Sequence, residues 1–444
     1  MLRGPSTSLA GAGAPLANDR NGIISPASAP IFFAFFTWGF GTGAQHLARP
    51  LFAYALTGNP ILVAFVVGMN AFPRIFTGPI TGYLTDRIGR KPLVIFGAGL
   101  RGASNVGQFM APDFATFLVL EFVGQVGVSM WNTSANVLLS DMTTTASRGR
   151  VLALRQMSMR MGFAAGPLVA GAVAAAISLP AVFLINGTSK VVIVVTVLFM
   201  VKETKPEPTQ PEPGAVAPAR GDARRAVLGA MRTRSFFALA ITIIGFSMTQ
   251  TALLQALLPI YASENLGVSF IGVGSLTSLA AVLAFVVAYP NGVLSDRFGR
   301  KVSMVPGLVL LAIASTILSL GDTFLIVLIA VSVQGSGEGM TMGTTHSYAM
   351  DLAPPEHRGS FLGTVMMFQA TGAFLGPMFI GALYHTISPV FAFATLAVWL
   401  AVAAVTMAFL GRETVGSRGP KPLVPAPATV TREPAASETL EEIA

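Results

Sequence analysis

Long apolar runs separated by short polar turns make up most of the sequence between residues 31 and 410. Many runs reach about 20 residues with few or no charges, the length that an α-helix needs to cross a hydrocarbon core of ~30 Å. The runs show no alternation of apolar and polar positions, which excludes a transmembrane β-barrel. The pattern predicts an all-α membrane protein with twelve transmembrane helices, near residues 31–49, 60–83, 92–110, 114–140, 150–175, 179–201, 236–261, 268–291, 302–320, 323–349, 359–384 and 388–410.

The two halves of the sequence repeat each other at a constant offset of 210 residues. This offset aligns Asp86 with Asp296, Arg90 with Arg300, Lys91 with Lys301, Asp141 with Asp351, Arg148 with Arg358, Gly166-Pro167 with Gly376-Pro377, and Glu203 with Glu413. Such self-similarity predicts duplicated structural units. We therefore expect two pseudo-symmetric six-helix bundles, with an N-terminal tail at 1–30, bundles at 31–201 and 236–410, a proline-rich linker at 202–235 and a disordered tail at 411–444.

Charged residues are scarce and unevenly distributed, at 11% of the chain against about 25% in a typical soluble domain. Of the 28 Lys and Arg residues, 22 fall in the tails and in the loops after even-numbered spans, five fall within spans, and only Arg49 falls in a loop on the other side. This bias predicts a protein of the cell (inner) membrane with both termini and the linker in the cytoplasm. It also explains the net charge of +8 without nucleic-acid binding.

Two further features of the composition exclude classes of processing and chemistry. Residues 1–30 lack the basic segment and apolar core of a removable signal peptide, so we expect the first span to direct insertion. The chain contains no cysteine, which excludes disulfides and thiol chemistry.

A charged turn occurs at the same place in each half. Its first copy reads Gly82-x-Leu84-x-Asp86-Arg87-x-Gly89-Arg90-Lys91, and its second reads Gly292-x-Leu294-x-Asp296-Arg297-x-Gly299-Arg300-Lys301. Together with the two six-span halves, these turns resemble the loop motif of the major facilitator superfamily, over about residues 30–412. The resemblance implies a secondary transporter whose halves rock around a site near the membrane midplane.

The resemblance also implies a role for the charged turn, because in that family it holds the two halves together in the outward-facing state. The implied gating latch consists of Asp86, Arg87, Arg90, Lys91, Asp141, Arg148, Asp296, Arg297, Arg300, Lys301, Asp351 and Arg358. We expect Asp141 to pair with Arg148 and Asp351 to pair with Arg358. The alternative is that the turns only fix the topology at the anionic leaflet.

The glycines of the turn have separate expected roles. Gly82 and Gly292 would let another helix approach closely. Gly89 and Gly299 would permit the reversal of the chain into the next span.

A stripe of small residues and proline lies in the fifth span and again in the eleventh, at Gly162, Gly166, Pro167 and Gly171 and at Gly372, Gly376, Pro377 and Gly381. The first set resembles the proton-antiporter motif of the superfamily, and small residues at this spacing predict close helix packing. The second copy leaves the alternative that symmetry alone accounts for both. In the fourth span, Glu121 lies where the family places a proton-linked arginine.

A few ionisable residues lie within the predicted spans, where a charge costs about 2.5–3.5 kcal/mol on insertion scales and usually faces a cavity or a partner. At 1.5 Å per residue from the cytoplasmic ends, Glu338 lies about 20 Å and Glu121 about 30 Å into the membrane. Glu338 is the first candidate for a proton carrier, and Glu121 near the outer mouth is the second. The alternative is that Glu338 is a fixed counter-ion for Arg160, which would otherwise bind an anionic substrate group.

Polar and aromatic residues on the spans that surround the cavity in this family are candidates for substrate binding. With Arg160, they are Trp38, Gln45, Gln125, Trp131, Gln250, Gln255, Gln334 and Gln369. For any one of them, the alternative is a hydrogen bond or packing contact between helices.

These patterns predict a proton-coupled secondary transporter that exports a small organic molecule, most like the twelve-helix drug:proton antiporters. The alternatives are a proton symporter that imports an organic anion and a non-transporting membrane sensor or scaffold. We do not expect an enzyme, because no nucleophile–base pair or metal-ligand cluster stands out. The expected partners are a small-molecule substrate, protons and the lipid bilayer, with no cofactor, metal or nucleic acid, and we expect a monomer.

Overall fold

This computed structural model describes residues 29–142, 148–203, 228–354 and 357–415, and this part of the chain consists of helices joined by short connections, with no strand. The first half comprises α1 (Ala29–Thr57), α2 (Pro60–Gly68), α3 (Phe72–Ile88), α4 (Arg90–Phe109), α5 (Phe114–Asp141), α6 (Arg148–Ala176) and α7 (Ala181–Met200). The second half comprises α9 (Arg234–Met248), η1 (Thr249–Leu257), α10 (Leu258–Ile260), η2 (Tyr261–Asn265), α11 (Phe270–Phe298), α12 (Arg300–Ser319), α13 (Phe324–Leu352), α14 (Arg358–Thr386) and α15 (Pro389–Leu410).

The length and composition of these helices suit a membrane. Within the described residues, nine helices are long and apolar enough to cross a bilayer. Large apolar side chains such as Phe199 and Phe409 are 77% and 83% exposed on the outside of the bundle, as expected for a surface that faces lipid. The all-α membrane architecture is therefore confirmed, and the count of twelve spans stays a prediction.

Three details of the helices differ from the predicted spans. Helix α1 continues to Thr57, so the prediction that Arg49 lies in a loop is wrong, and Arg49 is a buried residue of this helix. The second span is broken at residues 69–71, between α2 and α3. The seventh span contains two π-helical segments, η1 and η2. Such π-helical segments occur frequently at functional sites.

Side-chain caps fix where several helices begin. The Asn59 carboxamide oxygen accepts a 2.9 Å hydrogen bond from the backbone of Ile61 at the start of α2. The Asp113 carboxylate accepts one of 2.8 Å from the backbone of Thr116 at the start of α5. These caps satisfy backbone N–H groups that have no partner within the helix.

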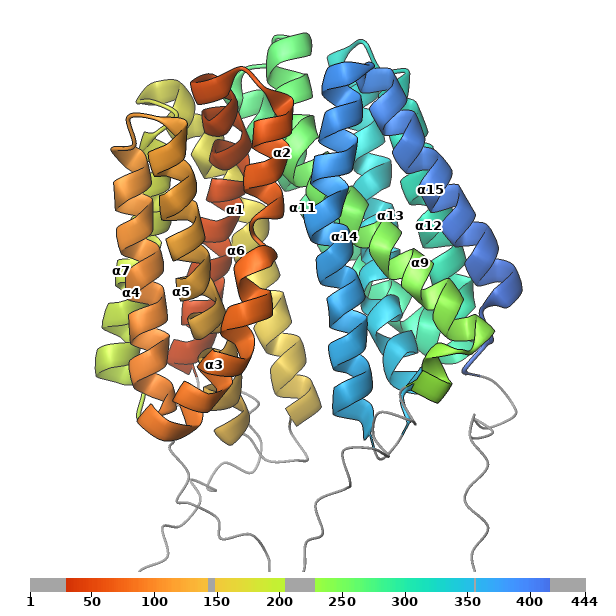
Figure 1. Ribbon diagram of the computed structural model, residues 1–444, viewed down its shortest axis with the longest axis horizontal. Coiled ribbons are helices and arrows are strands. Elements are labelled where there is room, and N and C mark those ends of the chain that lie inside the picture. Colours follow the sequence, from red (N-terminus) through yellow and green to blue (C-terminus); the bar gives the residue numbers. More distant parts are fainter. Residues whose placement is uncertain (1–28, 143–147, 204–227, 355–356, 416–444) are drawn as a thin grey trace, which may run out of the picture.

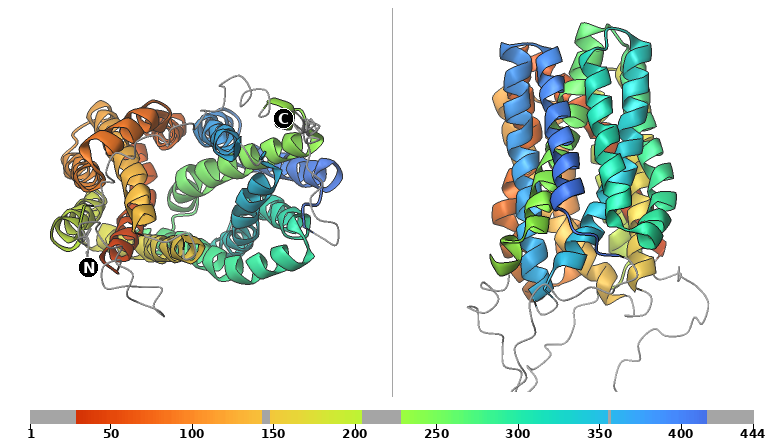
Figure 2. Two further views of the ribbon diagram at one scale, coloured as in Figure 1. Left: turned by 90° about the horizontal axis from the view of Figure 1, so that it is seen from below. Right: turned by 90° about the vertical axis from the view of Figure 1, so that its right-hand side faces the viewer.

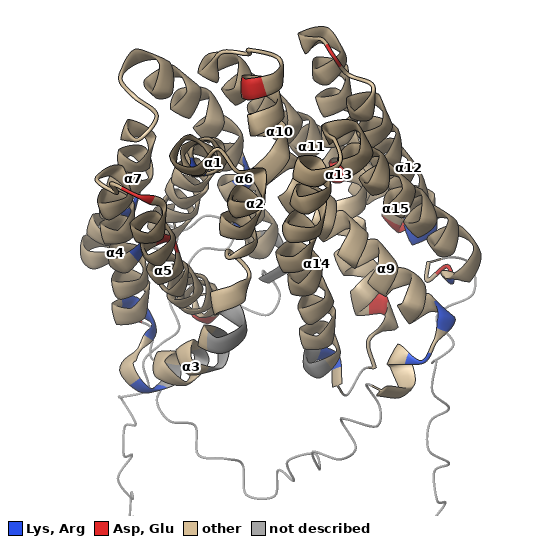
Figure 3. Cartoon of the chain, turned by 45° about the horizontal axis from the view of Figure 1, so that its top comes forward, with Lys and Arg blue, Asp and Glu red and all other residues tan. Residues whose placement is uncertain are grey.

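The helices form two groups that correspond to the two halves of the sequence (Figure 1). Seen along the helix axes, α6 lies beside α11 and α2 lies beside α14, and these contacts join the groups (Figure 2). Lys and Arg residues gather at the linker side, where α7 ends and α9 begins, and fewer lie in the middle of the helices (Figure 3). This distribution agrees with the predicted concentration of Lys and Arg on one side of the membrane.

The two groups touch through small residues, at the end of the bundle opposite the linker. Gly171 of α6 packs on the backbone of Phe270, and Gly274 of α11 packs on the backbone of Pro167, so neither position has room for a side chain. Gly68 of α2 packs in the same way on the backbone of Phe374 in α14. Close approach of this kind favours tight packing of helices in a membrane.

The remaining glycines of the two packing motifs lie at helix contacts as well. Gly162 and Gly166 pack on the backbone of α1, at Phe36 and Phe40. In the second half, Gly372 packs on the backbone of α9, Gly376 packs on Met248, and Gly381 packs on Ala64 of α2.

Candidate functional site

A cavity of about 420 Å³ lies between the two groups of helices. Its wall combines amide, charged and apolar side chains from α1, α4, α5, α6, α9, η1, α11, α13 and α14, together with the break between α2 and α3. Of the residues predicted to bind substrate or carry protons, those that border it are Trp38, Gln45, Gln125, Arg160, Gln250, Gln255, Glu338 and Gln369. Mixed polar and apolar lining at this volume is typical of small-molecule sites.

Two predicted substrate-binding residues do not border this cavity. Trp131 is fully buried behind Trp38, and the two rings stack with their centroids 3.8 Å apart and their planes 5° from parallel. Gln334 is buried and lies instead beside a small apolar gap with Leu253 and Leu258.

One face of α1 contributes a row of polar residues to the cavity, and sequence reasoning found only part of it. Trp38, Thr42, Gln45, His46 and Arg49 all border the cavity. Their spacing of three, four or one positions places them on one side of a helix. Extending this periodicity beyond residue 46 is the signal that identifies Arg49 as a site residue.

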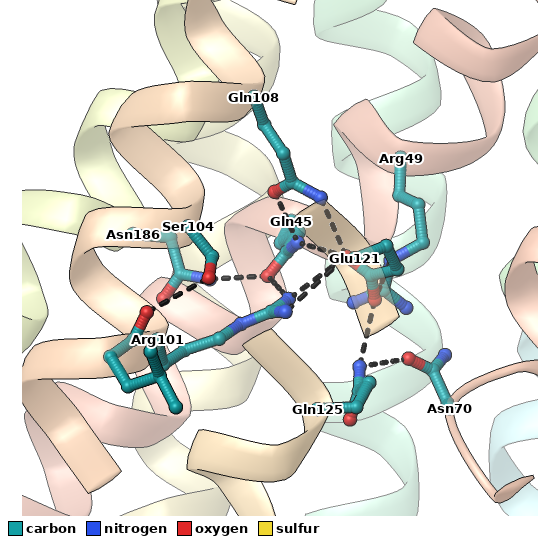
Figure 4. A network of polar contacts seen from close by, with 10 residues as sticks. Gln45, Arg49, Asn70, Arg101, Ser104, Gln108, Glu121, Gln125 and Asn186 are labelled. Atoms are coloured by element: carbon teal, nitrogen blue, oxygen red, sulfur yellow. Dashed lines mark hydrogen bonds and ion pairs between the residues drawn. The ribbon is translucent and has the colours of Figure 1, made fainter. Parts of the chain in front are cut away.

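The Glu121 carboxylate is the centre of a buried polar network beside the cavity (Figure 4). Its Oε2 atom accepts hydrogen bonds from Gln108 Nε2 at 2.7 Å, from Gln45 Nε2 at 3.3 Å and from the Arg101 guanidinium at 3.3 Å. Its Oε1 atom accepts one from Gln125 Nε2 at 2.7 Å and lies 3.1 Å from Arg49 Nε. Both carboxylate oxygens are therefore occupied by donors.

The network ties together several helices of the first half. Gln45 and Arg49 come from α1, Arg101 from α4 and Glu121 from α5. The Gln45 carboxamide oxygen accepts from Arg101 at 2.5 Å and from Asn186 of α7. Gln125 also donates to Asn70, in the break between α2 and α3. A shared set of charges and amides thus holds the first half together around one carboxylate.

The position of Glu121 near the outer mouth stays a prediction, and the structure adds what surrounds the side chain. The side chain is 0% exposed and enclosed by two arginines. The Arg101 guanidinium reaches the Glu121 carboxylate from α4, at 3.3 Å.

Glu338 has a different environment from Glu121. It is partly open to the cavity, and its Oε1 atom accepts a 2.7 Å hydrogen bond from Gln250 Nε2. Gln250 belongs to the π-helical segment η1. Across the described residues, no Lys, Arg or His lies within ion-pair distance of the Glu338 carboxylate.

Arg160 lies on the opposite wall of the cavity, in α6. Its Nη2 atom lies 2.6 Å from the sulfur of Met342, one helical turn from Glu338 on α13. A thioether is a weak acceptor, and a guanidinium carries five N–H donors. The side chain therefore keeps most of its hydrogen-bonding capacity for other groups.

Lys190 of α7 is buried behind the cavity wall. Its ammonium nitrogen lies 3.9 Å from the centroid of the Trp38 ring and 3.4 Å from the Trp38 carbonyl oxygen. The ring faces provide part of the charge stabilisation that water would supply outside the membrane. Lys190 thus packs against the residue that borders the cavity rather than bordering it itself.

The charged turns pair differently from the prediction. The Arg90 guanidinium lies 3.1 Å from the Asp141 carboxylate, and the Arg300 guanidinium lies 3.1 Å from that of Asp351. In this structure Asp351 contacts Arg300 and the Thr414 hydroxyl rather than Arg358, and the pair of Asp351 with Arg358 stays a prediction for the outward-facing state. Each pair lies within one half of the protein.

The other predicted latch residues lie at the same turns. Arg87 donates to the Tyr83 hydroxyl at 3.2 Å, and Asp296 lies 2.5 Å from Arg300. Arg297 and Arg358 are exposed. The side chains of Asp86 and Arg148, like any contact at Gly82, lie outside the described residues.

A glutamate carboxylate lies at the N-terminus of the helix that follows each charged turn, a role that was not predicted from the sequence. The Glu203 carboxylate accepts hydrogen bonds from the backbone of Arg90 at 3.0 Å and of Lys91 at 3.1 Å. Glu413 accepts from Arg300 at 2.7 Å and from Lys301 at 3.0 Å. A negative charge at a helix N-terminus is favourable. The 210-residue repeat contains the signal, because it aligns these two glutamates.

We expect Gly299→Ala to destabilise the protein by about 1–3 kcal/mol, the usual cost of a residue held in a glycine-only conformation. Gly299 has φ +114°, and a Cβ there would collide with the Glu413 carboxylate. Gly292→Ala, seven residues earlier, is the matched control, because nothing lies within 4 Å of its Cβ position. Thermal unfolding of the purified variants measures the difference in stability, and equal midpoints for Gly299→Ala and Gly292→Ala would contradict the expected destabilisation.

The open space around Gly292 also bears on its predicted role. The prediction that Gly292 allows a close helix approach is wrong in this structure, because no other helix lies against it.

Comparison with known proteins places these observations in a family. The model of the Major Facilitator Superfamily matches residues 31–264 and 240–440. The uncharacterized MFS-type transporter YfkF of Bacillus subtilis is 28% identical over 331 residues, which cover 71% of this chain and 79% of the relative. The class C tetracycline resistance protein of Escherichia coli is 24% identical over 335 residues, covering 72% and 79%.

Among solved structures, a bacterial homolog of the human lysosomal transporter Spinster, in an inward-facing and occupied conformation, has a similar fold. The TM-score is 0.71 at 15% sequence identity, over 88% of this chain and 98% of that chain. These relatives and neighbours are transporters rather than enzymes.

Proposed function

Because the chain belongs to the Major Facilitator Superfamily, we propose that this multi-pass membrane protein is a proton-coupled transporter that exports a small organic molecule by alternating access. The observation that carries the proposal is Glu338, a carboxylate that borders the cavity between the two halves and has one amide partner. A carboxylate within a membrane has a high free-energy cost, and such residues mark substrate and proton pathways in transporters. Its position at the cavity suits a group that exchanges protons as the access changes.

Glu338 suits this role better than Glu121 does. Glu121 accepts from three amides and faces two arginines, so protonation would break up an otherwise satisfied network. Protonation of Glu338 disturbs a single hydrogen bond to Gln250. We therefore assign Glu338 as the proton carrier and Glu121 as a fixed counter-ion.

The gating component of the proposal rests on where the halves touch. The small-residue contacts of α6 with α11 and of α2 with α14 lie at the end opposite the linker. The Arg90–Asp141 and Arg300–Asp351 pairs lie within the halves at the linker side. We assign this arrangement to the inward-facing state, with the linker in the cytoplasm. In the outward-facing state the charged turns would exchange partners across the halves, which makes them a bistable element.

Export by antiport is supported by one relative and by the available energy. A relative that covers 72% of this chain is a tetracycline resistance protein. One proton that moves down a potential of ~100 mV supplies about 2.3 kcal/mol. That free energy corresponds to a substrate gradient of roughly 50-fold.

Proton flux in liposomes that contain the purified protein and an internal pH dye tests the proposal. We expect an added substrate to drive protons in the direction opposite to its own movement. Liposomes with a bound ligand but no flux of ligand or protons would indicate a sensor and would contradict transport. The pH change that follows when the membrane potential is dissipated without added substrate measures the leakage of protons.

A proton symporter of an organic anion is the second candidate function, and Arg160 is the observation that favours it. Its guanidinium borders the cavity and has only the Met342 sulfur as a polar partner in the described part of the chain. Movement of protons in the same direction as an anionic substrate, in the same liposomes, would establish this alternative.

A further inference from the structure

Two charged side chains at the cavity, one positive and one negative, have no ion-pair partner among the described residues, and they come from opposite halves. Arg160 belongs to α6 in the first half, and Glu338 belongs to α13 in the second. The other two arginines that border the cavity, Arg49 and Arg101, both form ion pairs with Glu121. Among the described residues, Arg160 and Glu338 are therefore the charged groups at the cavity that have no ion-pair partner in the protein.

Both groups keep capacity for a ligand. The Glu338 carboxylate uses Oε1 for Gln250, and Oε2 has no partner in the described residues. Arg160 reaches the face of α13 that carries Glu338, since its contact Met342 lies four residues further along that helix. The two charges thus face the same part of the cavity while remaining too far apart for an ion pair.

A ligand with a single charge fits this pair poorly. A cation at Glu338 leaves Arg160 without a counter-ion, and an anion at Arg160 leaves an ionised Glu338 in the same position. An unpaired charge in a buried site carries a desolvation cost of several kcal/mol. A molecule with one cationic and one anionic group satisfies both side chains at once, and a cavity of about 420 Å³ accommodates a small organic molecule of this kind.

We propose that the substrate is an amphoteric small molecule that bridges the halves, with its anionic group on Arg160 and its cationic group on Glu338. This inference rests on the proposed function, because it takes Glu338 as the proton carrier. Binding of an ammonium group to protonated Glu338 releases the proton from the carboxyl group to the solvent, and the carboxylate then pairs with the ammonium. Proton and substrate thereby compete for one carboxylate, while Arg160 recognises the other end of the substrate.

Matched probes that differ only in charge test the proposal. One triplet is phenylalanine, 2-phenylethylamine and 3-phenylpropionate, and a second is the corresponding naphthyl set. Calorimetric titration of the purified full-length protein gives each affinity, and two buffers of different ionisation enthalpy give the number of protons released. We expect a zwitterion to bind at least about 10-fold more tightly than either singly charged analogue. It should release up to one proton per molecule bound.

Variants separate the two ends of the site. Arg160→Gln should reduce the affinity for the zwitterion to that for the amine, and Glu338→Gln should reduce it to that for the carboxylate and abolish proton release. Arg155→Gln is the matched control on the same helix, because Arg155 lies over the Phe35 ring and does not border the cavity. It should leave all affinities unchanged.

Several outcomes would overturn the inference. The first is that the zwitterion, the amine and the carboxylate bind with equal affinity in both triplets. The second is that neither zwitterion binds. The third is that the carboxylate binds more tightly than the zwitterion and takes up a proton on binding. The last outcome identifies coupled binding of anion and proton. Substrate-driven proton flux in the direction opposite to the substrate, if it persists alongside any of these results, leaves the proposed transport function standing, so the two failures can be told apart.

Discussion

Replacing Glu121 with glutamine is expected to lower the free energy of unfolding by about 3–5 kcal/mol, the usual cost of leaving buried charges without their partner. The substitution keeps the shape of the side chain but removes the single negative charge between Arg49 and Arg101. Three amide donors would also meet a neutral carboxamide, one end of which is itself a donor. Most of the folded protein should be lost on extraction into detergent.

Arg49→Gln is the informative comparison for this prediction. It removes one of two positive charges and leaves Arg101 paired with Glu121, so each remaining charge keeps a partner of opposite sign. We expect its destabilisation to be less than half that of Glu121→Gln. Thermal unfolding and the yield of monodisperse protein measure both variants. Similar stability of Glu121→Gln and wild type would show that the arginines find other counter-ions and would contradict a central role for this carboxylate.

The architecture was predictable because it depends on local and repeated features. Apolar runs define helices without reference to their neighbours, and the 210-residue offset shows the duplication directly. The charged turns were found for the same reason. The ion-pair partners within these turns were not predictable. Whether Asp351 pairs with Arg300 or with Arg358 depends on how α12 and α13 pack.

The site was only partly predictable, since a helix in a membrane lacks the usual contrast between an apolar and a polar face. Trp131 and Gln334 have residue types that suit a cavity, yet each points away from it. Arg49 was assigned to a loop because the first predicted span ends at this residue. Its place within α1 depends on Glu121 of α5, which is distant in the sequence and pairs with it only in the fold.

Glu121 is buried in a network, whereas Glu338 borders the cavity. This contrast leads to the prediction with the largest expected effect on transport. Glu338→Gln should abolish proton-driven substrate accumulation, because a glutamine neither takes up nor releases a proton at the cavity. Its effect on stability should be small, since among the described residues the side chain has one hydrogen bond, from Gln250, and a carboxamide oxygen can accept it too.

Liposomes with a substrate gradient and no proton gradient separate loss of coupling from loss of movement. In this assay Glu338→Gln should still exchange substrate, whereas a substrate-driven pH change should be absent. Glu264→Gln is the matched control, because Glu264 is an exposed acid at the end of η2 and should behave as wild type does. An undiminished pH change in Glu338→Gln would exclude this residue as the carrier. Proton movement would then have to pass through Glu121, at the expense of the network that it holds together.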